Sequence, residues 1–191
     1  MTSQVSPSFG VPLTREHCPD WLLRPGRAKC GPLWDTVFEV YEALTGLALP
    51  DEMPTTERRS LDAVVEHRDG VWRGLEVDEA QHFNPHRALT PDHYPQGTEL
   101  AFDRVVWHQR AMASTRLRGG GWGKARPPLF AQEGGRHLQR ASRDMLADLS
   151  PSTRGWAPTL RIGHVGVERW LDATDAIERM AELLEVTLAQ D

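Results

Sequence analysis

The chain has 191 residues, enough for one domain with a sizeable hydrophobic core. Its 39% hydrophobic and 26% charged residues and its mean hydropathy of -0.50 are typical of a globular protein, and no segment reaches the roughly 20 apolar residues that cross a bilayer. The net charge of -5 does not by itself indicate a nucleic-acid-binding protein.

Residues 1–31 contain proline and glycine and follow no clear hydrophobic period, so we predict an irregular N-terminal leader. The first residues have neither the basic start nor the apolar core of a secretory signal, so we expect a cytoplasmic protein. Cys18 and Cys30 in the leader are then expected to be two reduced thiols rather than a disulfide or half a zinc site.

Residues 32–191 are predicted to form a single domain of the α/β class. In chain order, hydrophobic periodicity and the positions of glycine and proline predict a helix over Leu33–Gly46, a strand pair over 59–78, a largely irregular segment over 79–98, helices over 99–117 and 133–149, a strand over 159–167 and a closing helix over 172–188. The helical stretch between about residues 99 and 150 is interpreted as an insertion.

The strand pair carries most of the chemistry, and the turn at residues 68–70 decides how its side chains meet. If only the last two of these residues turn, Asp62 faces Val77 and Glu76 points to the other side. If all three turn, with Gly70 in the left-handed conformation, Asp62 lies opposite Glu76. A slip of one residue inverts every side chain, and only the second register separates apolar from polar positions, so we favour it.

In the favoured register, two carboxylates oppose each other, and like charges repel unless a cation lies between them. Asp62 and Glu76 are therefore candidate ligands for Mg²⁺, which takes oxygen ligands and keeps several waters. The other register would separate them and favour an unrelated hydrolase or a structural protein.

Three further polar residues follow on or just beyond the second strand. Asp78 shares the face of the preceding carboxylates, and Gln81 and His82 come next. His82 can activate a water, hold it or stabilise a leaving group. A metal-binding pair of His82 with His86 is disfavoured, because Pro85 argues against a helix that presents both.

The motif consists of a strand with Asp62, then a short hairpin, and then the run Glu76-Val77-Asp78-x-x-Gln81-His82. This pattern resembles the PD-(D/E)XK nuclease superfamily, in particular the branch near the very-short-patch-repair-type endonucleases. The resemblance implies a restriction-endonuclease-like mixed β-sheet core flanked by helices. It also implies hydrolysis of phosphodiester bonds in DNA with Mg²⁺ or Mn²⁺. Asp62 and Glu76 would be the metal ligands, Asp78 would stand at the usual lysine position, and Gln81 and His82 would complete the site.

A glutamate on the preceding helix often contributes in that superfamily, and Glu39 is the candidate here for an extra acid. The chain departs from the pattern at Leu61, which replaces a proline, and at Glu79, where that branch usually has glycine. These departures and the missing lysine favour the alternative, a catalytically inactive module of the same fold that binds nucleic acid or a protein partner.

Basic residues concentrate in the segment 99–144, which holds nine of them against four acidic residues. An uneven charge of this kind can mark a phosphate-binding surface. DNA is therefore the expected partner, with a protein partner or a homodimer also compatible with the sequence. The arginines expected to hold phosphates, the last three of which share one helix face by their i, i+4, i+7 spacing, are Arg104, Arg110, Arg136, Arg140 and Arg143.

Overall fold

The computed structural model describes residues 4–5, 12–22, 26–53, 59–66, 70–113, 123–170, 172–176, 178–180 and 182–183. The helices are α1 (Arg27–Cys30), α2 (Trp34–Thr45), α3 (Pro85–Leu89), α4 (Arg104–Ala113), α5 (Gly135–Leu149) and α6 (His164–Val167), with 3-10 turns at Asp20–Leu22, Gly31–Leu33, Thr90–His93 and Ser152–Arg154. The strands are β1 (Gln4–Val5), β2 (Pro12–His17), β3 (Leu61–Glu66), β4 (Trp72–Asp78) and β5 (Ala157–Gly163). Within these ranges, no helix has the length and apolar character needed to cross a membrane.

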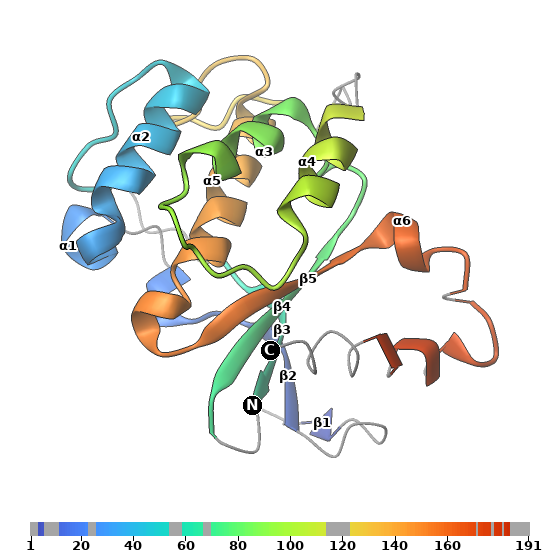
Figure 1. The fold of residues 1–191 in the computed structure, drawn as a ribbon. Helices are drawn as coiled ribbons and strands as arrows, with labels where there is room; N and C mark the ends of the chain where they lie inside the picture. Colours follow the sequence, from blue (N-terminus) through green and yellow to red (C-terminus); the bar gives the residue numbers. More distant parts are fainter. Residues whose placement is uncertain are drawn as a thin grey trace.

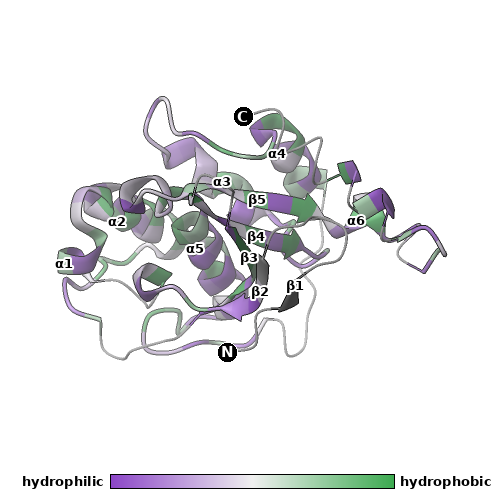
Figure 2. Ribbon diagram, turned by 90° about the horizontal axis from the view of Figure 1, so that it is seen from below, coloured by the Kyte–Doolittle hydropathy of each residue, from purple (hydrophilic) through white to green (hydrophobic). Residues whose placement is uncertain are grey.

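The strands form one mixed sheet in the order β1-β2-β3-β4-β5, in which β4 and β5 are parallel and the other neighbours are antiparallel. Helices α1, α2, α3 and α5 lie together on one side of the sheet, and α6 lies apart from them beyond the end of β5 (Figures 1 and 2). The predicted mixed sheet flanked by helices is therefore confirmed.

The helices between β4 and β5 are the crossover that joins the two parallel strands, because such strands cannot be joined by a tight turn. Residues 99–150, interpreted from the sequence as an insertion, hold most of this connection. Helix α5 packs on α2 and supplies much of the main core, through Leu138, Ala141 and Met145. The crossover is thus part of the core.

Helix α2 forms where the sequence predicted it. Val37, Val40 and Tyr41 are on its buried face, and it ends at Gly46, whose φ of 71° is the left-handed conformation that favours glycine at a helix C-cap. The Tyr41 hydroxyl donates a hydrogen bond to the Leu129 carbonyl at 2.6 Å, so a buried polar group is satisfied where α2 meets the crossover.

The favoured hairpin register is confirmed, since Val64 pairs with Gly74 and Glu66 with Trp72. Gly70 has a φ of 82°, the left-handed conformation that the three-residue turn requires, while residues 67–69 lie outside the described ranges. Helix α5 packs over the face that bears Glu76.

Two hydrogen bonds show which face α5 covers. The Thr159 hydroxyl donates to the Ala147 carbonyl at 2.6 Å, and the Arg161 guanidinium donates to the Asp144 carbonyl at 3.0 Å. Glu76 is directly beside Arg161 in the parallel pair of strands, so it shares this face. Charged side chains therefore lie between sheet and helix, where ion pairs and hydrogen bonds must compensate for lost hydration.

Three segments differ from the prediction. Residues 12–17 of the expected irregular leader form β2, which pairs with β3. The expected loop 79–98 contains α3, because Pro85 occupies the first helical turn, where its missing N–H costs nothing, and the Asn84 side chain accepts from the next two backbone N–H groups. The last strand ends at Gly163 rather than at residue 167, and α6 follows it.

The two remaining helices agree with the prediction only in part, because residues 99–103 and 172–175 are described and are not helical. Helix α4 begins at Arg104, later than expected, because the Asp103 side chain caps it by accepting from the N–H groups of Val105 and Val106. The closing helix predicted over 172–188 falls partly outside the described residues, although 178–180 and 182–183 are helical.

Candidate functional site

A depression of about 730 Å³ opens where β3 and β4 meet α5, and we call it the polar depression. It is lined from several elements that are far apart in the sequence, including β2, the start of α6 and the residues that follow β4. The residues singled out in the sequence that line it are Asp62, Glu76, Gln81, His82, Arg136, Arg140 and Arg143.

Asp62 presents an exposed carboxylate at the edge of the polar depression. Its Oδ2 accepts a hydrogen bond from the backbone N–H of Val77 at 2.7 Å. The paired positions of β3 and β4 begin at Ala63, so the Asp62 side chain binds β4 just beyond the regular strand pairing. This bond fixes the carboxylate in the neighbourhood of Glu76.

Glu76 is buried, with 4% of its surface exposed. Its Oε2 accepts from Arg59 Nη2 at 3.0 Å, whereas among the described residues no hydrogen-bond donor reaches its Oε1. Burial raises the pKa of Glu76 to about 7, against the attraction of Arg59 and Arg161. Arg59 cannot fully compensate, because it also pairs with Asp144 at 3.3 Å.

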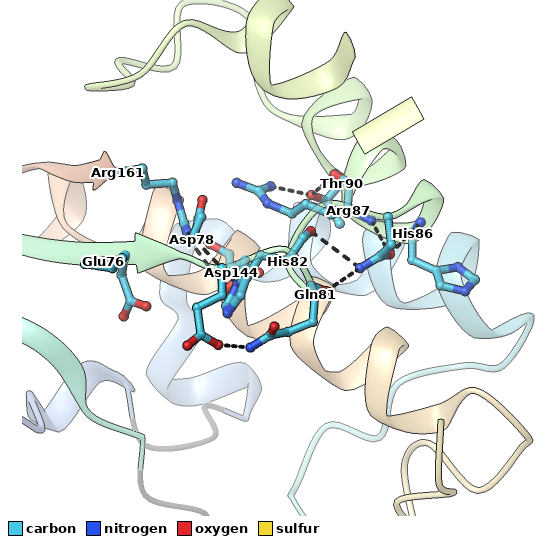
Figure 3. Close-up of polar contacts among 12 residues, drawn as sticks. Glu76, Asp78, Gln81, His82, His86, Arg87, Thr90, Asp144 and Arg161 are labelled. Atoms are coloured by element: carbon cyan, nitrogen blue, oxygen red, sulfur yellow. Dashed lines mark hydrogen bonds and ion pairs between the residues drawn. The ribbon is translucent and has the colours of Figure 1, made fainter. Parts of the chain in front are cut away.

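Asp78 is 1% exposed, and both of its oxygens are engaged. Oδ1 accepts from Arg161 Nη1 at 2.7 Å, and Oδ2 accepts from the Trp107 indole N–H at 2.7 Å. Its Oδ1 also lies 3.5 Å from Nδ1 of His82. Asp78 is thus held behind the polar depression as a contact of His82 rather than lining it (Figure 3).

His82 is held by an aspartate that the sequence did not point to. Its Nδ1 lies 3.0 Å from Oδ2 of Asp144, a fully buried residue of α5. Burial alone would lower the pKa of His82, but the charge and hydrogen bond of Asp144, together with the charge of Asp78, raise it above its ordinary value. The imidazole therefore favours the protonated state more than a free histidine does.

Burial alone would raise the pKa of Asp144, yet His82, Arg161 and Arg59 hold it well below the usual range for a carboxyl group. The sequence contains one signal for this residue. Asp144 and Asp148 are four residues apart on the stripe of α5 that also carries the core residues Ala141 and Met145. Two carboxylates at core positions of an amphipathic helix indicate buried ionic partners.

Gln81 and His86, which are close to His82 in the sequence, differ in their positions relative to the polar depression. Gln81 lines the polar depression, and its side-chain amide donates to the carboxylate of Glu79. His86 lies on α3, and Figure 3 shows its ring directed away from His82. The two histidines are therefore not arranged as a metal-binding pair.

Arg136, Arg140 and Arg143 all line the polar depression, so the prediction that they share one helix face is confirmed. Burial, and then the charges of neighbouring arginines, lower the pKa values of Arg136 and Arg140. The concentration of positive charge that lowers them is also what attracts an anion to this wall.

Three other predicted residues lie away from the polar depression. Arg104 is an exposed partner of Asp92 at 3.1 Å, and the guanidinium of Arg110 lies 5.1 Å from the centre of the Trp107 ring. Glu39 is on the exposed face of α2, because the opposite face of this helix packs into the core. The proposed roles of these three residues at the site are therefore not supported by their positions.

Within the described ranges, no three His, Cys, Asp or Glu side chains form a group that could hold a metal ion by themselves. Mg²⁺ does not require such a group, because it usually binds through one or two carboxylates and keeps several waters. No protein-family model, curated protein or solved structure matches this chain. We therefore infer the function from the residues of the site alone.

The raised pKa of Glu76 predicts a pH dependence of stability. The folded protein keeps a proton on Glu76 between its ordinary value of 4.5 and about 7, whereas the unfolded chain loses it, so the free energy of unfolding falls as the pH rises through this window. The share of Glu76 amounts to about 3 kcal/mol at most. His82, whose pKa is also raised, contributes in the same direction near neutral pH.

The measurement is urea unfolding of the protein and of Glu76→Gln at several pH values in the presence of a chelator. Glutamine cannot titrate, so the variant should lose less stability than the parent between pH 4.5 and 7. If the free energy of unfolding changes equally with pH in the two proteins, Glu76 has an ordinary pKa.

Proposed function

We propose that this protein is a nuclease that hydrolyses phosphodiester bonds in DNA with the help of Mg²⁺ or Mn²⁺. The observation that carries the proposal is the composition of one depression. Its acidic wall holds Asp62 and Glu76, and α5 adds Arg136, Arg140 and Arg143 on another wall. An acidic pair can bind a cation beside arginines that bind a phosphate, and a phosphodiester substrate requires both.

The donor set fits a hard divalent cation. Glu76 Oε1 is a buried acceptor that no donor among the described residues reaches, and leaving such an atom unsatisfied costs about 1–3 kcal/mol. The carboxylate of Asp62 is exposed at the same depression. When bound by these two residues, the ion would polarise a phosphoryl oxygen and acidify a water.

His82 has the properties of a proton donor to the leaving oxygen. Asp144 orients its ring through Nδ1 at 3.0 Å, and the raised pKa of His82 keeps more of it protonated near neutral pH. Asp78 supports the same ring at 3.5 Å as a positioning residue. Gln81 would orient the attacking water or the leaving group from the same depression.

The contact of Arg59 with Glu76 favours a second candidate, a catalytically inactive module that binds nucleic acid or a protein partner. The guanidinium lies 3.0 Å from Oε2 of Glu76 and 3.3 Å from Oδ1 of Asp144, so it already supplies a positive charge to the acidic residues. In an active nuclease the metal ion must compete with this arginine for Glu76.

The nuclease and the inactive module differ in the expected effect of a divalent cation on DNA cutting. The purified protein is incubated with supercoiled plasmid and with a labelled single strand, in Mg²⁺, in Mn²⁺ and in EDTA. Nicking or cutting with either ion but not in EDTA is expected for the nuclease. Binding without any cutting would leave the inactive module, and neither binding nor cutting would exclude the nuclease and the nucleic-acid-binding module, leaving only a module that binds a protein partner.

A further inference from the structure

A second cavity, of about 620 Å³, lies between α4 and the chain that follows β5. Its volume is in the range of about 300–1,000 Å³ that small-molecule sites have. We call it the aromatic cavity, because the side chains that characterise it are Phe102, Trp107 and Trp170, together with Arg110 and Asp103.

The three aromatic rings are half-buried, so part of each remains accessible from the cavity. Phe102 and Trp107 have ring centres 5.3 Å apart at an angle of 47°. The indole N–H of Trp107 is donated to Asp78, which fixes the orientation of the ring. Fixed aromatic faces in a cavity are suited to stacking with a flat ring.

Arg110 places a cation beside these rings. Its guanidinium lies 5.1 Å from the centre of the Trp107 ring and extends over Gly163 at the end of β5. A Cβ on Gly163 would come within 2.5 Å of Nη1, so the missing side chain provides the room for the guanidinium. With the carboxylate of Asp103, the cavity offers both donors and an acceptor to the polar edge of a heteroaromatic ring.

Residues that line the aromatic cavity are neighbours of residues at the polar depression in two places. Gly163 lines the cavity and its neighbour His164 lines the depression. Trp107 in the cavity is bonded to Asp78, which lies 3.5 Å from His82 in the depression. A ligand that spans both therefore has a flat ring at one end and an anionic group at the other, which is the chemistry of a nucleotide.

We propose that the aromatic cavity binds an unpaired base of the nucleic-acid strand whose phosphates lie in the polar depression. This inference rests on the proposed function for the identity of the strand as DNA. A base inside a duplex must be unpaired and unstacked, at a cost in free energy, before it can enter such a cavity. The substrate class it names is accordingly single-stranded DNA rather than a fully paired duplex.

The test compares two probes of equal charge in EDTA, so that no cutting occurs. One is a dye-labelled oligothymidylate, and the other is an oligomer of the same length made of abasic deoxyribose phosphates. The protein is expected to bind the first about 10- to 100-fold more tightly, as stacking of a base on aromatic side chains predicts. Equal affinity for the two probes would overturn the inference, and so would failure to bind either.

Two variants locate the effect in the cavity. Trp170→Ala should reduce the preference for thymidylate, whereas Phe38→Ala, a half-buried aromatic residue on α2 outside both concavities, should keep it. Urea unfolding checks that each variant folds. Gly163→Ala is a second variant, because its methyl group meets only the flexible end of Arg110 and the ring of Phe83 at 3.5 Å. It should weaken the preference without unfolding the protein.

These outcomes separate the inference from the nuclease proposal. A Trp170-dependent preference for bases in a protein that never cuts DNA supports the cavity and refutes the nuclease. Metal-dependent cutting by a protein whose binding of both probes is unaffected by Trp170→Ala refutes the cavity alone.

Discussion

Replacing Asp62 by asparagine or Glu76 by glutamine is expected to lower metal-dependent DNA cleavage by at least about 10³-fold, because a bound cation contributes several kcal/mol of transition-state stabilisation and each 1.36 kcal/mol is a factor of ten in rate. Asparagine at position 62 keeps an oxygen that can accept the N–H of Val77, so it removes the charge and retains the local hydrogen bond. Glutamine at position 76 likewise keeps the length of the side chain.

The measurement is the rate of plasmid nicking at saturating Mg²⁺, and the matched control is Glu66→Gln. Glu66 is on β3 with Asp62 but does not line the polar depression. The Glu66→Gln variant should nick the plasmid at the same rate as the parent protein. If Asp62→Asn and Glu76→Gln also cut like the parent, the metal site proposed here is wrong, even if the protein is a nuclease.

Replacing Arg161 by methionine is expected to reduce the free energy of unfolding by about 3–5 kcal/mol, the usual cost of removing one partner from a buried ion pair. The guanidinium is fully buried and donates to Asp148 at 2.6 Å, to Asp78 at 2.7 Å and to the carbonyl of Asp144 at 3.0 Å. Without it, three buried aspartates, Asp78, Asp144 and Asp148, lose a partner. A loss of this size is a large part of the 5–15 kcal/mol that stabilises a typical domain.

Urea unfolding with Arg104→Met as the control measures this effect. Arg104 pairs with Asp92 at 3.1 Å, but both side chains are about half exposed, and such pairs contribute at most about 1 kcal/mol. If both variants lose the same stability, the buried network does not stabilise the fold. If Arg161→Met fails to fold at all, the Arg161→Lys variant, which keeps a charge, should recover part of the stability.

The buried network also explains why sequence reasoning placed too few residues at the site. Asp148 accepts from Arg87 at 2.6 Å and from the Tyr94 hydroxyl at 2.6 Å, in addition to Arg161. Neither Arg87 nor Tyr94 belongs to a recognisable motif, and the segment that contains them was predicted to be mostly irregular. Their roles become visible only when α3, α5 and β5 are packed together.

Local features were predicted well where short-range physics determines them. The hairpin register follows from the turn and from the alternation of side chains, and α2 follows from its apolar face and Gly46. The common face of the arginines on α5 follows from the helical period. Each of these three features depends on residues that are close in the sequence, within about one or two helical turns or strand lengths of one another.

Local sequence patterns could not predict which face of the hairpin the helices would cover. The sequence by itself determined the register of the two strands that carry Asp62 and Glu76, because turn geometry and alternation are local. Only the tertiary structure decided that α5 covers the face that bears Glu76. It brings Asp144 to His82 across 62 residues of sequence and Arg161 to Asp78 across 83. Such pairings depend on burial, where an unpaired charge is costly, and no local pattern specifies them.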